Sequence, residues 1–169
     1  MLKPAICYKD ELDKALAEYF YTEDMMFYTG CLDSCLLDIK RSGEDGYYQY
    51  AVVGKDSNLI GYIAYRVDYY SSCVYNFGAF SFDRGNPVMG KELFDLLERC
   101  VNTYHRVSFM AVEGNPAIRG YDKFLDRHSD IGRKIMFMDV FKDARGNYRN
   151  TYTYEFVKKL EDMQYDRDV

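Results

Sequence analysis

Two copies of the tripeptide Gly-Asn-Pro constrain the fold of this chain more than any other feature. They lie at residues 85–87 and 114–116, each between an aromatic and aliphatic run typical of a strand and an amphipathic pattern typical of a helix. Asparagine is a favoured helix N-cap because its side-chain oxygen accepts a backbone N–H, and proline suits the first helical position because it has no N–H to leave unpaired. Each tripeptide is therefore predicted to end a strand and start a helix.

A helix that starts directly after a strand is also suited to an anion. Its first N–H groups have no partner within the helix, and they lie at the positive end of the helix dipole. The first copy carries the cations Arg84 and Lys91 nearby, which oppose this dipole unless an anionic ligand is bound, although ordinary surface charge would also account for them. Because parallel strands that feed helices open a crevice at their carboxyl ends, we expect a ligand cleft between the two tripeptides.

Size and charge narrow the class of protein. With 169 residues, 48% of them hydrophobic, the chain is predicted to form a single domain over residues 1–169, with a charged tail at 159–169 that frays. The net charge of −5 and the lack of a Lys/Arg cluster argue against a nucleic-acid partner. No apolar run approaches the roughly 18–20 residues of a membrane helix, so a soluble cytoplasmic protein is expected.

The cysteines and histidines indicate a reduced protein without metal. Five cysteines is an odd number, and most of them fall on apolar faces, so buried thiols are expected rather than disulfides. There is no Cys-x-x-Cys and there are only two histidines, which makes a structural zinc site improbable. The cysteines are Cys7, Cys31, Cys35, Cys73 and Cys100.

Hydrophobic periodicity predicts the order ααβββαβαββ. This is an α/β (α+β) chain with a mixed, mostly antiparallel sheet, a βαβ crossover in the middle and a closing hairpin. Gly78 is expected to mark a bulge that splays the strand at 72–82 away from the strand at 107–112. Two helices are predicted at residues 8–21 and 26–39. Two more are predicted to follow the two tripeptides, and the one after the second tripeptide ends near residue 128. The predicted strands span residues 47–53, 59–68, 72–82, 107–112, 134–141 and 148–156.

This order, together with the residues at the two tripeptides, resembles the GNAT superfamily of acetyl-CoA-dependent N-acetyltransferases over roughly residues 8–158. The resemblance implies a three-layer fold with a central sheet. In that family the fourth strand is followed by a Gln/Arg-x-x-Gly-x-Gly/Ala loop that wraps the coenzyme A pyrophosphate. Here the corresponding run, residues 81–93, reads Ser-Phe-Asp-Arg-Gly-Asn-Pro-Val-Met-Gly-Lys-Glu-Leu.

Two registers of this run against the family loop stay open. Aligning Arg84 with the family's arginine puts Pro87 and Met89 where glycines are expected. Aligning Gly90 with the final glycine instead puts Gly85 at the position of the arginine. The loop is degenerate in either register, but the capped helix start, a flexible glycine and nearby cations are retained.

The second family signature is Asn-x-x-Ala-x-x-x-Tyr after the fifth strand. The run from Asn115 to Tyr121 resembles it with one residue fewer before the tyrosine. The resemblance implies that Asn115 lies along the coenzyme and that Tyr121 protonates the departing thiolate. Core packing is the alternative role for Tyr121, since Ile118 and Phe124 share its apolar stripe.

The resemblance also implies the remaining site residues. Backbone N–H groups of the fourth strand, around Phe80–Phe82, would meet the pantetheine arm and the acetyl carbonyl. Glu113, at the end of the fifth strand, is the first candidate for the general base that takes the proton of the amine, ahead of Asp83 and Glu23; a solvated strand-end charge is its alternative. The implied coenzyme-binding residues are Phe80, Ser81, Phe82, Arg84, Gly85, Asn86, Gly90, Lys91 and Asn115.

The predicted function is an N-acetyltransferase that moves an acetyl group from acetyl-CoA directly to an amine, without metal. The amine is a small molecule or a peptide, and the acidic charge balance favours a cationic one. In the family the amine is read by the segment at residues 22–30 and by the last hairpin. The alternative is a catalytically degenerate GNAT-like module that binds coenzyme A or another protein, and a homodimer is compatible with either.

Overall fold

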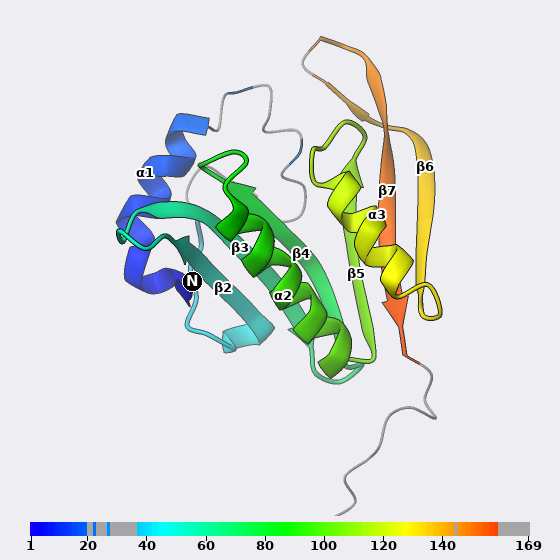
Figure 1. The fold of residues 1–169 in the computed structure, drawn as a ribbon, viewed down its shortest axis with the longest axis horizontal. Coiled ribbons are helices and arrows are strands. Elements are labelled where there is room, and N and C mark those ends of the chain that lie inside the picture. Colours follow the sequence, from blue (N-terminus) through cyan, green and yellow to red (C-terminus); the bar gives the residue numbers. More distant parts are fainter. Residues whose placement is uncertain (20–21, 23–26, 28–36, 144, 159–169) are drawn as a thin grey trace, which may run out of the picture.

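The computed structural model describes residues 1–19, 22, 27, 37–143 and 145–158 (Figure 1). The predicted second helix lies largely outside these residues, and residues 37–39 at its end are not helical. The predicted tail at 159–169 also lies outside them, as do Glu23, Cys31 and Cys35.

Seven strands form one mixed sheet in the order β1-β2-β3-β4-β5-β7-β6. Paired strands are antiparallel except β4 and β5, which are parallel. The six predicted strands are confirmed to within two residues at each end, whereas β1 was missed because three residues are too few to show an alternating pattern. The strands are β1 (Leu2–Pro4), β2 (Tyr47–Val53), β3 (Leu59–Asp68), β4 (Cys73–Ser81), β5 (Arg106–Val112), β6 (Gly132–Lys142) and β7 (Tyr148–Val157).

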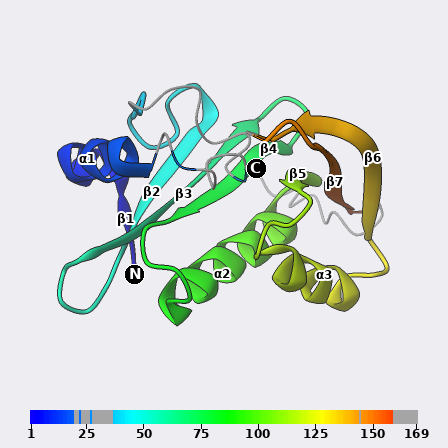
Figure 2. The same cartoon turned by 90° about the horizontal axis from the view of Figure 1, so that it is seen from above.

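Helices cover both faces of the sheet, which confirms the three-layer α+β class. Figure 2 shows α2 (Pro87–Thr103) and α3 (Ile118–Arg127) on one face and α1 (Lys9–Tyr19) on the other. Short 3₁₀ turns span Ala5–Tyr8 and Glu44–Gly46. Among the described residues, no helix is both long and apolar enough to cross a membrane.

The core consists of two clusters, one on each face of the sheet. The cluster beneath α2 and α3 includes Leu97, Phe109 and Phe124, and the cluster beneath α1 includes Leu16 and Phe80. Successive residues of a strand point to opposite faces, so β4 contributes to both clusters. Alternation along β4 therefore decides which of the two clusters each of its side chains joins.

Strands β4 and β5 pair only at their beginnings. Their register contains two pairs, Cys73 with Arg106 and Val74 with Val107. The register between β3 and β4 shifts directly afterwards, where Asn76 and Phe77 together face Tyr65. The bulge thus lies just before Gly78 rather than at it, and Asn76 carries the unusual backbone angle (φ 51°). Such a bulge bends its strand, and beyond it β4 and β5 no longer pair.

The described cysteines agree only partly with the prediction of buried thiols. Cys73 and Cys100 are buried and reduced, whereas Cys7 is exposed. Burial raises the pKa of the Cys100 thiol to about 12, so this group stays protonated at neutral pH. Cys7 precedes α1 in a 3₁₀ turn, where helical periodicity does not predict which side chains face inward.

The N-cap of α2 yields a stability prediction. The Asn86 Oδ1 atom accepts the Val88 N–H at 2.9 Å, and Pro87 opens the helix, as the tripeptide predicts. Replacing Asn86 with alanine should lower the free energy of unfolding by about 0.5–2 kcal/mol, because one N–H of the first turn loses its partner. Urea denaturation measures this loss.

The matched control is Arg99→Ala, an exposed position on the same helix, which should change stability by less than about 0.5 kcal/mol. Equal effects of the two substitutions would show that the cap does not contribute measurably to stability.

Candidate functional site

A cavity of about 390 Å³ lies where β4 and β5 have separated. Both Gly-Asn-Pro segments contribute to its wall, as the sequence predicts. The lining comprises Phe27, Ala79, Ser81, Arg84, Gly85, Asn86, Met89, Gly90, Leu93, Phe94, Asn115, Pro116, Ala117, Gly120 and Tyr121. Seven of these residues are among the site residues expected from the sequence, so the cavity is our candidate functional site.

The start of α2 forms one wall and is open toward the cavity. Gly85 has a positive φ of 80°, which glycine adopts without strain, and it leads into Asn86 and Pro87. A Cβ atom added at Gly85 or at Gly90 would meet no other atom within 4 Å. The Asn86 side chain is already engaged, accepting from Val88 and donating to Asp83. The helix start therefore presents backbone and open space rather than side chains.

The second tripeptide forms the opposite wall with a different local structure. Asn115 Oδ1 accepts the Ala117 N–H at 2.9 Å, and its Nδ2 donates to the backbone oxygen of Phe27 at 3.3 Å. Helix α3 begins only at Ile118, and its cap residue Ala117 supplies no side-chain hydrogen bond. The prediction that this tripeptide starts the helix directly was wrong, because Asn115 closes a turn that precedes the helix.

Phe80 and Phe82 do not line the cavity. Both side chains pack in the cluster beneath α1, on the far face of the sheet from the cavity. The Phe82 N–H donates to the Ile60 oxygen of β3, and strand alternation turns the Phe80 N–H to the same side. The neighbouring Ser81 then directs its N–H toward the separated β5. Of residues 80–82, which were expected at the site, Ser81 lines the cavity.

Tyr121 is both a core residue and part of the cavity wall. It is 6% exposed and packs against the rings of Phe109, Tyr154 and Phe94 at centroid distances of 4.8, 5.5 and 5.8 Å. Its ring orientation is therefore fixed by three aromatic neighbours. Core packing is therefore confirmed, and Tyr121 also borders the cavity, while its role as an acid stays a prediction.

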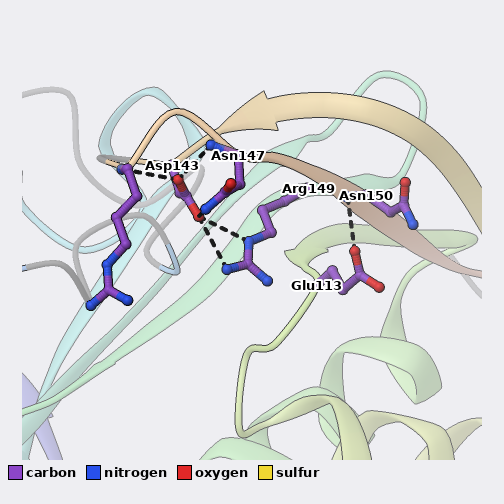
Figure 3. Close-up of polar contacts among 6 residues, drawn as sticks. Glu113, Asp143, Asn147, Arg149 and Asn150 are labelled. Carbon is purple, nitrogen blue, oxygen red and sulfur yellow. Dashed lines mark hydrogen bonds and ion pairs between the residues drawn. The ribbon is translucent and has the colours of Figure 1, made fainter.

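Glu113, Lys91 and Asp83 are not part of the cavity wall. Glu113 lies at the end of β5, as expected, but its Oε2 accepts the backbone N–H of Asn150 on β7 at 3.2 Å (Figure 3). Lys91 forms an ion pair with Asp95 one helical turn along α2. Both side chains thus have structural partners in this state of the protein.

The hairpin between β6 and β7 is held by Asp143 (Figure 3). The Asp143 carboxylate accepts the backbone N–H groups of Arg145 and Asn147 at 3.0 and 2.9 Å. It also accepts two hydrogen bonds from the Arg149 guanidinium, both at 3.1 Å. These contacts, with the Asn147 N–H foremost, lower the pKa of Asp143 below its ordinary value of 3.8.

Sequence reasoning missed several wall residues. Phe27 lies in the segment expected to read the substrate, but nothing in the local pattern places its backbone oxygen against Asn115. Phe94 appears in the pattern only as one of the apolar residues of α2, yet a Cβ on Gly120 would meet its ring at 2.5 Å. A glycine inside the predicted α3 was the available signal, since helical glycines often mark a close approach.

A second, larger hollow lies at the opposite end of β4. Its volume is about 830 Å³, and its wall includes Asp45, Arg66 and Tyr70. The Arg66 guanidinium lies over the Tyr47 ring and donates to the Asp45 backbone oxygen. None of its wall residues belongs to a helix start that follows a strand. The smaller cavity is therefore the stronger candidate.

The fold defines a class of protein. Comparison with solved structures shows that the chain has the fold of GNAT N-acetyltransferases. No family model matches the sequence, and no curated protein matches it significantly.

Individual neighbours are distant in sequence. A protein assigned as a phosphinothricin N-acetyltransferase aligns with a TM-score of 0.65 and 14% identity over 93% of this chain and 97% of its own. The spermidine N-acetyltransferase of Vibrio cholerae, in complex with CoA and spermine, aligns with a TM-score of 0.63 and 12% identity over 93% and 94%. The manganese complex of spermidine/spermine N-acetyltransferase SpeG from the same organism aligns at 0.54 and 14% over 68% of this chain and 66% of that one, just under two thirds of its length.

The Asp143 contacts predict a specific dependence of stability on pH. Because the folded pKa is lowered, the unfolded chain binds a proton first as the pH falls below about 4, and the stabilisation by the carboxylate disappears as the pH passes through the folded pKa. The stability difference between the wild type and Asp143→Asn should therefore be constant above about pH 5 and shrink at lower pH. Urea titrations at each pH measure it.

A difference that stays unchanged down to pH 3 would show that the charge of Asp143 does not contribute to the hairpin.

Proposed function

We propose that this chain transfers an acetyl group from acetyl-CoA to an amine. The observation that supports this most is the cavity between the start of α2 and the Asn115 turn, at the end of the sheet where β4 and β5 separate. It combines an open helix start with an apolar wall. This combination suits a ligand that has an anionic part and an extended arm.

The residues present fit coenzyme A. Arg84 and the N–H of Gly85, at the positive end of α2, are suited to a pyrophosphate, and the missing side chains at Gly85 and Gly90 leave room for it. Ser81 directs its N–H toward the opening beside β5, where an extended arm can pair with β4 as a further strand would. Asn115 would border this arm from the opposite wall.

The chemistry of acetyl transfer requires three events. The amine loses a proton, the thioester oxygen gains negative charge, and the departing thiolate is protonated. The Ser81 N–H is suited to the developing oxygen charge, and Tyr121 is the candidate acid because its ring is fixed in the cavity wall. Glu113 stays a candidate base only if its hydrogen bond to Asn150 is given up when substrate binds.

Transfer is proposed to be direct, without an acetyl-cysteine intermediate. A nucleophilic cysteine needs a lowered thiol pKa and access to the donor. Cys100 is buried with a raised pKa, Cys73 is buried, and neither lines the cavity. Cys7 is exposed but does not belong to the cavity wall.

The acceptor is proposed to be a small amine or a peptide amine. Structural neighbours include N-acetyltransferases of the polyamines spermidine and spermine. The net charge of −5 favours a cationic acceptor. Sequence identity of 12–14% is too low to assign the particular amine of a neighbour to this chain. The acceptor is therefore proposed only as an amine.

Gly90 provides a test in which stability and binding change in opposite directions. Gly90→Ala adds a methyl group in open space and should stabilise α2 by up to about 1 kcal/mol, because alanine favours the helix over glycine. The same methyl group would occupy part of the coenzyme path, so the Kd for acetyl-CoA should rise roughly tenfold, which is about 1.4 kcal/mol. Thermal melts without ligand and calorimetric titration with acetyl-CoA measure the two effects.

Thr103→Ala, an exposed change at the other end of α2, is the matched control and should leave the Kd unchanged. If Gly90→Ala binds acetyl-CoA as tightly as the wild type, the coenzyme does not bind at this helix start. If the wild-type protein binds no acetyl-CoA, the protein-interaction alternative is favoured.

The role of Tyr121 is tested by removing only its hydroxyl. Tyr121→Phe should lower turnover by about 10²–10⁴-fold, the usual contribution of a general acid, while the aromatic packing keeps the fold intact. Release of coenzyme A from acetyl-CoA measures turnover, with an amine chosen from a panel that includes spermine.

Tyr154→Phe is the control. Tyr154 lies beside Tyr121 but donates its hydroxyl to Asp122 at 2.7 Å, outside the cavity wall, so its loss should affect stability more than turnover. A Tyr121→Phe protein within a few-fold of wild-type activity would leave Tyr121 as a core residue only.

A further inference from the structure

A groove between α2 and α3 continues the candidate site. Figure 2 shows the two helices side by side on one face of the sheet. The groove has a volume of about 430 Å³ and is lined by Phe94, Gly120, Lys123, Asp126 and Arg127. Phe94 and Gly120 also line the cavity at the start of α2. A ligand that fills the cavity can therefore extend past these two residues along α3.

Three cations follow this groove along α3, at Arg119, Lys123 and Arg127. A spacing of four residues places all three on one side of the helix, and each is exposed. Arg119 and Lys123 form no hydrogen bond or ion pair with any other residue that the structure describes, and Arg127 lies over the Phe124 ring. We call these three residues the α3 cation row. Exposed cations are common on protein surfaces, so their meaning depends on the charges and spaces around them.

The carboxylates of α2 and α3 do not neutralise the α3 cation row. Four of these five groups contact a partner outside the row: Glu92 contacts the N-terminal amine, Asp95 contacts Lys91, Glu98 contacts His128, and Asp122 contacts Lys134. The fifth, Asp126, lines the groove and forms no ion pair with another described residue. The groove is therefore locally cationic in a chain whose net charge is −5, which favours an anionic ligand at this position.

The proposed donor carries such an anion at its nucleotide end. Beyond its pyrophosphate, coenzyme A has an adenosine with a phosphate monoester on the 3′ oxygen of the ribose. A phosphate monoester has a charge of about −1.5 to −2 at pH 7, and lysine and arginine side chains are its usual partners in proteins. With the pyrophosphate at the start of α2, the adenosine leaves the cavity beside the Phe94 ring, which offers an apolar surface.

We propose that the α3 cation row binds the 3′-phosphate of coenzyme A, with Lys123 and Arg127 as the two members that line the groove. This inference rests on the proposed function, because it takes acetyl-CoA as the donor. It adds a determinant of donor choice that lies outside the cavity. The chain distinguishes coenzyme A from 3′-dephospho-coenzyme A, although the two share the pyrophosphate and the pantetheine arm.

The test compares these two ligands, which differ only in the 3′-phosphate. Calorimetric titration of the wild type should give a Kd for 3′-dephospho-coenzyme A about tenfold above that for coenzyme A, because exposed ion pairs each contribute a factor of a few. The double variant Lys123→Gln/Arg127→Gln should bind both ligands with the Kd that the wild type has for 3′-dephospho-coenzyme A. Each single variant should lose part of the preference. Salt should weaken the preference in the wild type.

Lys14→Gln is the matched control. It removes the same charge from an exposed position on α1, on the opposite face of the sheet, and should keep the preference for coenzyme A. Melting temperatures without ligand show whether each variant is folded.

Three results separate this proposal from the proposed function. A wild type that binds both ligands equally, or a double variant that keeps the preference, would overturn the 3′-phosphate assignment and leave the acetyl-transfer proposal standing. A double variant weakened by the same factor for both ligands would also overturn it, because the cations would then act elsewhere than on this phosphate. A wild type that binds neither ligand at millimolar concentration would contradict both proposals.

Discussion

The pairing of β4 and β5 is restricted to two residue pairs, and the candidate site depends on this restriction. A bulge at Asn76 and Phe77 bends β4 directly after the last pair. Beyond these two pairs the facing edges of the two strands are not paired with each other. A cavity forms between them because the helices that follow β4 and β5 start on either side of the opening. The same backbone groups that would stabilise a longer sheet are thereby available to a ligand.

Gly90 departs from the most stable choice for a helix at this opening. Glycine at position 90 is less favourable than alanine in a helix by about 1 kcal/mol, although a methyl group would fit there. Local departures from the most stable choice are expected where function constrains a sequence. A ligand that needs space at the helix start would account for this glycine.

Local signals predicted the fold well. Asn86 and Pro87 start α2 as their chemistry requires, and the alternation of β2 and β3 gave the boundaries of both strands. The same tripeptide at residues 114–116 did not start α3, because Asn115 was recruited to a turn and to Phe27, a contact over 88 positions of sequence. A short sequence motif cannot predict a hydrogen bond to a residue so far away in the sequence.

The candidate site was predicted in outline but not in orientation. The sequence indicates that residues 80–82 border the ligand, yet only the register with β3 decides that Ser81 faces the opening and its phenylalanine neighbours do not. Glu113 was expected near the cleft from its place at a strand end, and a hydrogen bond to β7 directs it elsewhere. Contacts between strands that are distant in sequence determine which side a strand residue faces and which group binds a charged side chain.

The central claim is that coenzyme A binds at the start of α2 between the separated strands. Amide chemical shifts in a two-dimensional NMR titration with coenzyme A test it directly, because each backbone N–H reports its own surroundings. The account predicts that the largest changes occur at Gly85, Gly90 and Asn115. Changes centred on Asp45 and Tyr70, in the larger hollow at the other end of β4, or no changes at millimolar coenzyme A, would contradict it.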